Sequence, residues 1–202
     1  IYFSKIKVKL REVLLRDKPF EMLDISSKGT VPVLELEENI LDESIDIMLW
    51  ALNINDSEDI LCPYREQKNF VLDTINKFDQ EFKYHLDRYK YSTRHLNEKD
   101  FLSKKEHRNE GIKHLKNIQN ILEKNNAEYL YKNKISFLDL ALFPLVRQYK
   151  IADTSFFNEN IDIKLVNIWL ENQINAIFFK NIMYKYKVWN SDANPVYFEN
   201  SL

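Results

Sequence analysis

The first part of the chain contains stretches in which apolar and polar residues follow the period of a β-strand. Residues 5–13 alternate between apolar side chains on one side and lysine or arginine on the other. A period of two over this length predicts a half-buried strand. Residues 31–36 predict a second strand. After a polar turn at residues 37–39, residues 40–41 predict a short strand that returns antiparallel.

Helical periods connect these strands and then fill the rest of the chain. Apolar residues recur at helical spacing in residues 44–53. A short helix is predicted around residues 19–23, because proline is tolerated at a helix start. After residue 64 the patterns predict helices at residues 65–91, 103–124, from Ser136 onward, 161–173 and 176–185, with a polar break at 92–101, a loop at 125–135 and an extended tail at 188–202.

The change of period divides the chain. Residues 54–63 have no period and many turn-forming residues, so we interpret them as a linker. We therefore predict an α/β domain at residues 1–53, followed by an all-α helical-bundle domain at residues 64–202.

Composition narrows the class of protein. The chain has 202 residues and a net charge of −2, which argues against a general nucleic-acid binder because such proteins usually carry a basic excess. The single cysteine, Cys62, excludes an intramolecular disulfide framework and fits a reducing compartment such as the cytoplasm. No apolar run approaches the roughly 20 residues of a membrane span, and no signal peptide is visible. The chain begins with Ile1 rather than methionine, so we do not expect an intact translation product.

The first candidate motif runs from Lys28 to Leu34. Gly29, one of only two glycines, precedes Thr30, Val31 and Pro32. A proline in a strand-like run lacks the N–H that would donate to a neighbouring strand, so its presence there needs a reason. A tight turn with a cis bond between Val31 and Pro32 would be such a reason.

The pair Glu43-Ser44 follows this motif and precedes an apolar helical run. Serine in that place is expected to cap a helix, whose N-terminus favours anions. Taken alone, a Gly-x-x-Pro turn and a capped helix could also be plain scaffold in any α/β protein.

The second motif is Ser136-Phe137-Leu138-Asp139, which reads as a capping box. The helix that follows is apolar nearly all round, so it is expected to be buried. A buried helix start needs its backbone N–H groups satisfied. We therefore assign Ser136 and Asp139 to folding rather than to catalysis, and expect Pro144 to kink the helix.

Together the stretches KGTVPVLEL, ILDESIDIMLWAL and SFLDLALFPLVRQY resemble the glutathione S-transferase family, over about residues 6–189. The resemblance implies a thioredoxin-like α/β domain, without its first strand and most of its first helix, followed by an all-α domain. It also implies that Val31, beside Pro32, offers its backbone to the cysteinyl part of glutathione, and that Glu43 and Ser44 hold the γ-glutamyl end. Lys28 could pair with a glutathione carboxylate or be solvated.

The resemblance further implies an activity. Glutathione would be the co-substrate, its thiolate would attack an electrophilic small molecule or reduce a disulfide, and the protein would be a homodimer without nucleic-acid or membrane partners. In this family the residue that activates the thiol follows the first strand, so it would lie upstream of Ile1 and is unknown. The alternative is a non-catalytic interaction or stress-regulatory module of the same fold, and the intact Glu43-Ser44 pair favours the enzyme. Family members usually carry a glycine near Tyr131-Lys132, and this chain has none there.

Two further features are interpreted as structural. Cys62-Pro63-Tyr64 is similar to the active-site motif of cysteine-type relatives, but it lies in the linker and no second cysteine follows, so we do not assign it to catalysis. The four histidines show no metal-ligand spacing, and we predict no metal.

Overall fold

The computed structural model describes residues 1–96, 98, 102–125 and 128–198. It contains two compact units. We call residues 1–60 and 180–202 the N-terminal unit and residues 61–179 the helical unit. Each is described by itself. Parts of the predicted polar break at 92–101, of the loop at 125–135 and of the tail at 188–202 lie outside the described residues.

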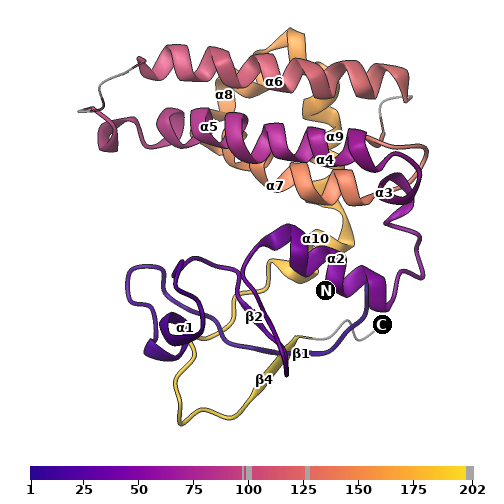
Figure 1. Ribbon diagram of the computed structural model, residues 1–202. Coiled ribbons are helices and arrows are strands. Elements are labelled where there is room, and N and C mark those ends of the chain that lie inside the picture. Colours follow the sequence, from indigo (N-terminus) through magenta and orange to yellow (C-terminus); the bar gives the residue numbers. More distant parts are fainter. Residues whose placement is uncertain (97, 99–101, 126–127, 199–202) are drawn as a thin grey trace. The chain divides into compact units, whose positions relative to one another are not determined.

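The N-terminal unit combines short strands with the helices α1 and α2 (Figure 1). In chain order its elements are β1 (Val8–Leu10), α1 (Phe20–Ile25), β2 (Leu34–Glu35), β3 (Ile40–Leu41), α2 (Ser44–Ile54) and β4 (Val196–Phe198). Strands β2 and β3 form an antiparallel hairpin in which Leu34 is opposite Leu41. The predicted strands are present but shorter than their alternating patterns, because ladder pairing covers only two or three residues of each.

Strand β4 comes from the C-terminal end of the chain. It pairs antiparallel with β1, with Val8 opposite Phe198 and Leu10 opposite Val196. The sequence prediction placed the end of the helix at 176–185 and the tail at 188–202 in the helical domain, whereas the described residues from 180 to 198 group with the N-terminal unit. Helix α3 (Cys62–Glu66) starts inside the predicted linker.

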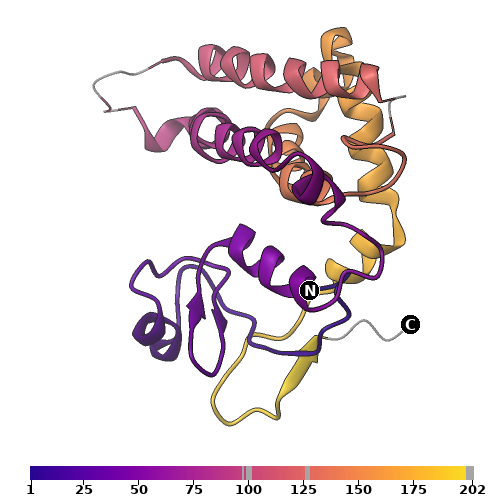
Figure 2. The same cartoon turned by 45° about the vertical axis from the view of Figure 1, so that its right-hand side comes forward.

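The helical unit contains most of the helices (Figures 1 and 2). The predicted helix at residues 65–91 is divided, because Gln67 leaves helical backbone angles with φ −139° and ψ 51°. Beyond α3 the elements are α4 (Lys68–Lys77), the π-helical segment η1 (Phe78–Phe82), α5 (Lys83–Lys90), the 3-10 turn η2 (Ser92–Arg94), α6 (Lys104–Lys124), α7 (Phe137–Ala152), α8 (Thr154–Glu159), the 3-10 turn η3 (Ile161–Ile163), α9 (Lys164–Asn175) and α10 (Ile177–Ile182), which ends in the N-terminal unit.

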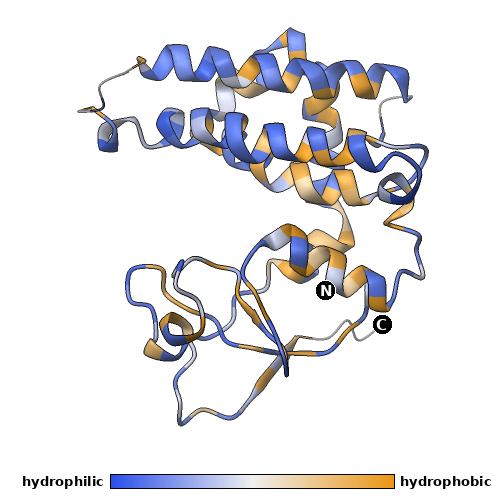
Figure 3. Cartoon of the chain, in the orientation of Figure 1, coloured by the Kyte–Doolittle hydropathy of each residue, from blue (hydrophilic) through white to orange (hydrophobic). Residues whose placement is uncertain are grey.

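Helix α7 forms the centre of the helical unit. Its buried side chains include Leu138, Leu142 and Val146, each 0% exposed, and it packs against α4, α5 and α9. Figure 3 shows α7 as a largely apolar helix, whereas α6 carries many hydrophilic residues. The helix retains Pro144 in its interior. The nearly continuous apolar pattern thus correctly predicted a buried helix.

The start of α7 is closed by the predicted capping box. Asp139 is 0% exposed. Its carboxylate accepts hydrogen bonds from the Ser136 N–H (2.9 Å) and hydroxyl (2.6 Å), the Leu130 N–H (2.8 Å) and the Trp169 indole N–H (2.8 Å). These donors come from the loop before α7, the helix start itself and α9. Asp139 therefore ties three segments together.

Close packing in the helical unit also depends on a glycine. The backbone of α6 at Gly111 lies against the ring of Tyr149 on α7, so that a Cβ atom there would clash with the ring carbons. The Tyr149 hydroxyl donates to the Arg108 carbonyl at 2.5 Å. Glycine is needed at this helix crossing because any larger residue would displace a fully buried aromatic ring.

Candidate functional site

The candidate site begins at the turn after α1. Gly29 has a φ of +57°, in the left-handed region that glycine adopts without steric cost. Its N–H donates to the Ser26 carbonyl at 3.0 Å, and an added Cβ would meet Leu23 Cδ2 at 3.1 Å. The turn therefore requires glycine and directs the next residues toward β2.

The bond between Val31 and Pro32 is cis, as the sequence predicted. Val31 is 46% exposed, and Pro32 is also exposed. Within the described part of the chain, neither the N–H nor the C=O of Val31 makes a hydrogen bond. A free backbone donor and acceptor on an exposed residue can pair with the backbone of a peptide-like ligand.

The pair Glu43-Ser44 lies at the start of α2, but the cap differs from the prediction. Glu43, not Ser44, is the N-cap residue, with φ −112° and ψ 134°, and its side chain makes no capping hydrogen bond. Ser44 is the first helical residue. Both side chains are exposed. The N–H groups of the first turn therefore have no side-chain cap and remain suited to an anion.

Lys28 joins these two segments. Its Nζ donates to Glu43 Oε1 at 2.6 Å and to Asp42 Oδ1 at 3.0 Å. Ser26 donates to the second oxygen of Asp42 at 3.1 Å. The sequence left open whether Lys28 is solvated or binds a ligand carboxylate. In the structure its ammonium is half exposed and pairs with two carboxylates of its own chain.

Electrostatics at this cluster follow from the pairing. Hydrogen bonds from Lys28 to Glu43 and then Asp42 raise the pKa of Lys28. The hydrogen bond from Lys28 is the main reason why the pKa of Asp42 is lowered. All these groups are near solvent, so the pairs contribute little to stability. They do fix the positions of the charges beside the start of α2.

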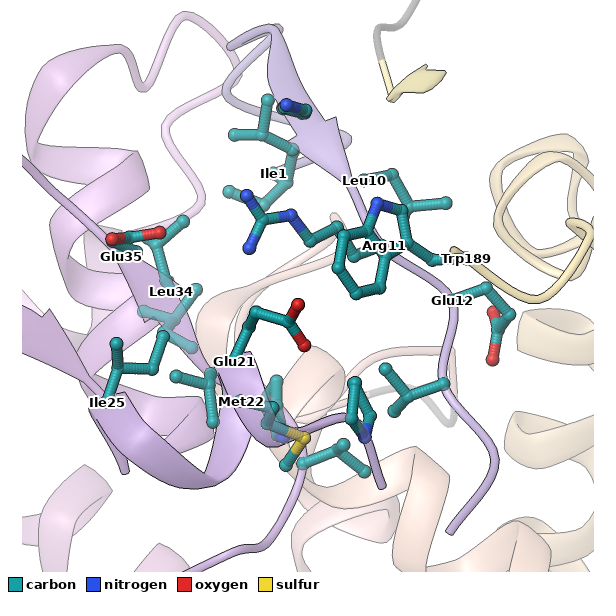
Figure 4. A pocket seen from close by; sticks show the side chains of 18 of the residues that line it. Ile1, Leu10, Arg11, Glu12, Glu21, Met22, Ile25, Leu34, Glu35 and Trp189 are labelled. Atoms are coloured by element: carbon teal, nitrogen blue, oxygen red, sulfur yellow. The ribbon is translucent and has the colours of Figure 1, made fainter. Parts of the chain in front are cut away.

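A pocket of about 760 Å³ lies in the same unit. Val31 and Pro32 belong to its lining, whereas Lys28, Glu43 and Ser44 do not. Figure 4 shows Ile25 and Leu34 on one side of the pocket and Leu10 and Trp189 on the opposite side. The lining also includes Ile47 and Trp50 of α2. The pocket therefore has a mostly apolar lining that also includes charged residues such as Arg11, Glu21 and Glu35, and one part of the predicted site borders it.

Sequence reasoning missed two contributors. Asp42 anchors both Lys28 and Ser26, and its place directly before Glu43 was the only signal that could have suggested it. Trp189 reaches the pocket from the C-terminal segment, where its N–H donates to the Glu12 carbonyl at 2.8 Å. No local sequence pattern predicts a contact between residues so far apart in the chain.

Cys62 occupies a different environment, in the helical unit. It is buried at the start of α3, and its thiol lies 3.2 Å from Glu66 Oε1 and 3.3 Å from Lys132 Nζ. Glu66 also accepts from the Tyr131 hydroxyl at 2.7 Å, and Lys132 is the main reason why the pKa of Glu66 falls to about 2. Cys62 is thus part of a polar cluster joining α3 to the loop before α7. Lys132 has a φ of +53°, at the place where the resemblance led us to expect a glycine.

Over the described part of the chain, no group of three or more histidine, cysteine or acidic residues could hold a metal ion. No helix in that part is long and apolar enough to cross a bilayer.

The fold defines a class: a thioredoxin-like α/β unit followed by a mostly helical one, as the sequence predicted. Comparisons with known proteins extend this result. A family model described as "Glutathione S-transferase, N-terminal domain" matches residues 1–59, and one described as "Glutathione S-transferase, C-terminal domain" matches residues 80–166. The chain belongs to the glutathione S-transferase family.

Solved structures show the same fold. A glutathione S-transferase from Rhodospirillum rubrum F11 matches with a TM-score of 0.65 at 16% identity, over 90% of this chain and 81% of that one. A glutathione S-transferase from Actinobacillus pleuropneumoniae matches with a TM-score of 0.61 at 14% identity, over 81% of this chain and 72% of that one. A search of curated proteins found no match.

Proposed function

We propose that the N-terminal unit binds glutathione at the surface formed by the Lys28–Pro32 segment and the start of α2. The observation that carries the proposal is the 2.6 Å contact between Lys28 Nζ and Glu43 Oε1, because it brings these two segments together. Family membership and the exposure of Val31, Glu43 and Ser44 support it.

The γ-glutamyl end and the cysteinyl backbone of glutathione have counterparts in this proposal. The exposed carboxylate of Glu43 accepts from the γ-glutamyl ammonium, and the Ser44 hydroxyl and the N–H groups at the start of α2 bind its carboxylate. The N–H and C=O of Val31, beside Pro32, pair with the cysteinyl backbone. Lys28 donates to Asp42 and Glu43, and the third N–H of its half-exposed ammonium can bind a ligand carboxylate.

The proposed activity is glutathione transfer. The bound thiol acts as thiolate, and its sulfur bonds to an electrophilic carbon as a leaving group departs, or to a disulfide sulfur as the other thiolate departs. We assign no residue of this chain to thiol activation. The second substrate is an electrophilic or disulfide small molecule, and we propose a homodimer in the cytoplasm. Light scattering during size-exclusion chromatography should give twice the chain mass of 24.3 kDa.

Calorimetric titration of the full chain with reduced glutathione tests binding. Replacing Glu43 with alanine removes a charge-assisted hydrogen bond worth about 1.5–3 kcal/mol, which corresponds to a loss of affinity of roughly 10-fold to 100-fold. Asp46→Ala is the matched control, because Asp46 is also an exposed acidic residue in the first turn of α2. Equal affinities of the Glu43→Ala variant and wild type would refute the role of Glu43. No heat at millimolar glutathione would refute binding and favour the non-catalytic module.

A further inference from the structure

Helices α5 and α6 of the helical unit meet through a pair of histidines. The Nδ1 atom of His85 lies 2.9 Å from the Nδ1 atom of His107. His107 is 2% exposed and His85 is half-buried. The two residues are 22 positions apart, so this contact is a product of helix packing and not of a sequence motif.

The chemistry of imidazole limits the charge that this contact can carry. A hydrogen bond between two Nδ1 atoms requires one to carry hydrogen and the other to present a lone pair. A histidine that has gained a second proton donates from both ring nitrogens. When both residues are protonated, two donors with like charges face each other. The contact is therefore compatible with at most one imidazolium in the pair.

The surroundings give little compensation for a second charge. The ring of Tyr84 lies edge-on to both histidines, with centroids 5.1 Å from His85 and 5.9 Å from His107. Arg88 on α5 adds a like charge near the pair, although it forms a bidentate pair with Glu98, at 2.8 and 2.9 Å. The other titratable groups near the pair are Glu106, Glu110 and His114 of α6 and His95 of the α5–α6 connection.

Burial is the largest cause of a lowered pKa at both histidines. At His85 the next cause is the charge of His107, and at His107 it is the charge of Arg88. Glu110 opposes the shift at His85, and Glu98 and Glu106 oppose it at His107, without reversing either. His114, whose pKa is lowered by burial, faces Glu81 of η1 at 3.8 Å.

We propose that the His85–His107 contact is an acid-sensitive joint, which holds α5 against α6 until a second proton enters the pair. This inference is independent of glutathione binding. An opened α5–α6 interface exposes both histidines, whose ordinary pKa is about 6.5. The packed form binds fewer protons below that value, so its stability is complete above about pH 6.5 and is lost as pH falls through the lowered pKa values of the packed pair.

Proton NMR titration of the full chain, with a chelator present, tests the pair directly. Wild type should show two histidine titrations below about pH 6.5 that belong to the coupled pair. In His107→Asn the side chain facing His85 is an amide, which does not take up a proton. No like charge from that side chain then opposes protonation of His85, so the pKa of His85 should rise. His114→Asn removes a histidine from the same interface but keeps the contact, and both steps should remain. A His85 pKa that is identical in wild type and His107→Asn would overturn the proposal.

Hydrogen exchange read by mass spectrometry gives the second measurement. After correction for intrinsic exchange, protection of α5 and the first half of α6 should fall on acidification, by about tenfold per pH unit for each proton taken up on opening. In His85→Asn the protection should depend less steeply on pH. Because His85 is less buried than His107, this variant replaces His107→Asn in the test if that protein does not fold. Equal protection at pH 7.5 and pH 5.5 in wild type would also overturn the proposal.

Discussion

The starts of α2 and α7 both carry a serine and an acidic residue. At α7 these side chains are buried and form a cap, whereas at α2 they are exposed and form none. At α7, Ser136 and Asp139 close a capping box, and the Asp139 carboxylate accepts from four donors while being 0% exposed. At α2, the Glu43 side chain makes no cap, and both it and Ser44 remain exposed. A serine and an acid at a helix start therefore do not define a role by themselves. The state of their hydrogen bonds distinguishes a folding motif from groups available to a ligand.

The largest effect is expected where the carboxylate is buried. Asp139→Ala leaves donors from Leu130, Ser136 and Trp169 without their acceptor, and each unsatisfied buried donor costs about 1–3 kcal/mol, so the free energy of unfolding should fall by about 3–5 kcal/mol in total. Urea unfolding followed by circular dichroism measures it. Asp73→Ala, at an exposed position on α4, is the control and should change stability little. A small loss for Asp139→Ala would mean that the closed box is not a folding element.

The two glycines of the chain extend the comparison, since one lies in each unit. In the helical unit, Gly111→Ala should destabilise by about 1–3 kcal/mol because the new methyl group overlaps the Tyr149 ring. Helix propensity alone predicts the opposite sign. Thermal unfolding checks this against Asn109→Ala, an exposed site two residues earlier on α6 that should be neutral or slightly stabilising. Equal melting temperatures for the Gly111→Ala variant and wild type would show that Tyr149 can move aside.

In the N-terminal unit, Gly29→Ala should cost less, about 1–2 kcal/mol, because the strain comes mainly from the left-handed backbone and the Leu23 contact is at the tip of a side chain. Faster hydrogen exchange in residues 26–36 is the expected result. Thr30→Ala, exposed and adjacent, serves as control. If the Gly29→Ala variant exchanges like wild type in this segment, the turn does not need its glycine.

The smallest effect is expected at Asp42, whose pairs are exposed to solvent. Its lowered pKa means that its contribution to stability is present above the ordinary value of 3.8 and is lost as pH falls from there through the lower folded value. Asp42→Asn should therefore differ from wild type above pH 4 by a small amount, and the difference should vanish in more acidic solution. Acid unfolding curves of both proteins measure this. A difference that persists unchanged at pH 2 would show that the charge of Asp42 is not its source.

The sequence predicted the features that depend on local chemistry. The cis bond before Pro32 and the box of Ser136 and Asp139 are confirmed. The cap of α2 was displaced by one residue, because the boundary depends on the backbone angles of Glu43 and not on the apolar pattern. Helix α8 was not predicted, since it is only 6 residues long.

Contacts between distant residues could not be predicted. Strand β4 pairs with β1 across almost the whole chain, and a ladder between such partners leaves no local period. For the same reason, the sequence could not predict the contact between His85 and His107 or the contribution of Trp189 to the pocket. The roles of Val31, Glu43 and Ser44 toward glutathione stay predictions until binding is measured.

The pairing of β1 with β4 also sets an order of events during synthesis. Residues 8–10 leave the ribosome early, but their ladder partners at 196–198 are made only after the entire helical unit. Domains generally fold as units while the chain emerges. The N-terminal unit is completed only by residues that are translated after the helical unit. Strand β1 therefore has no β4 partner while residues 61–179 are translated. A chain whose synthesis ends within α9 would have most of the sequence of its helical unit, but its first strand would have no β4 to pair with.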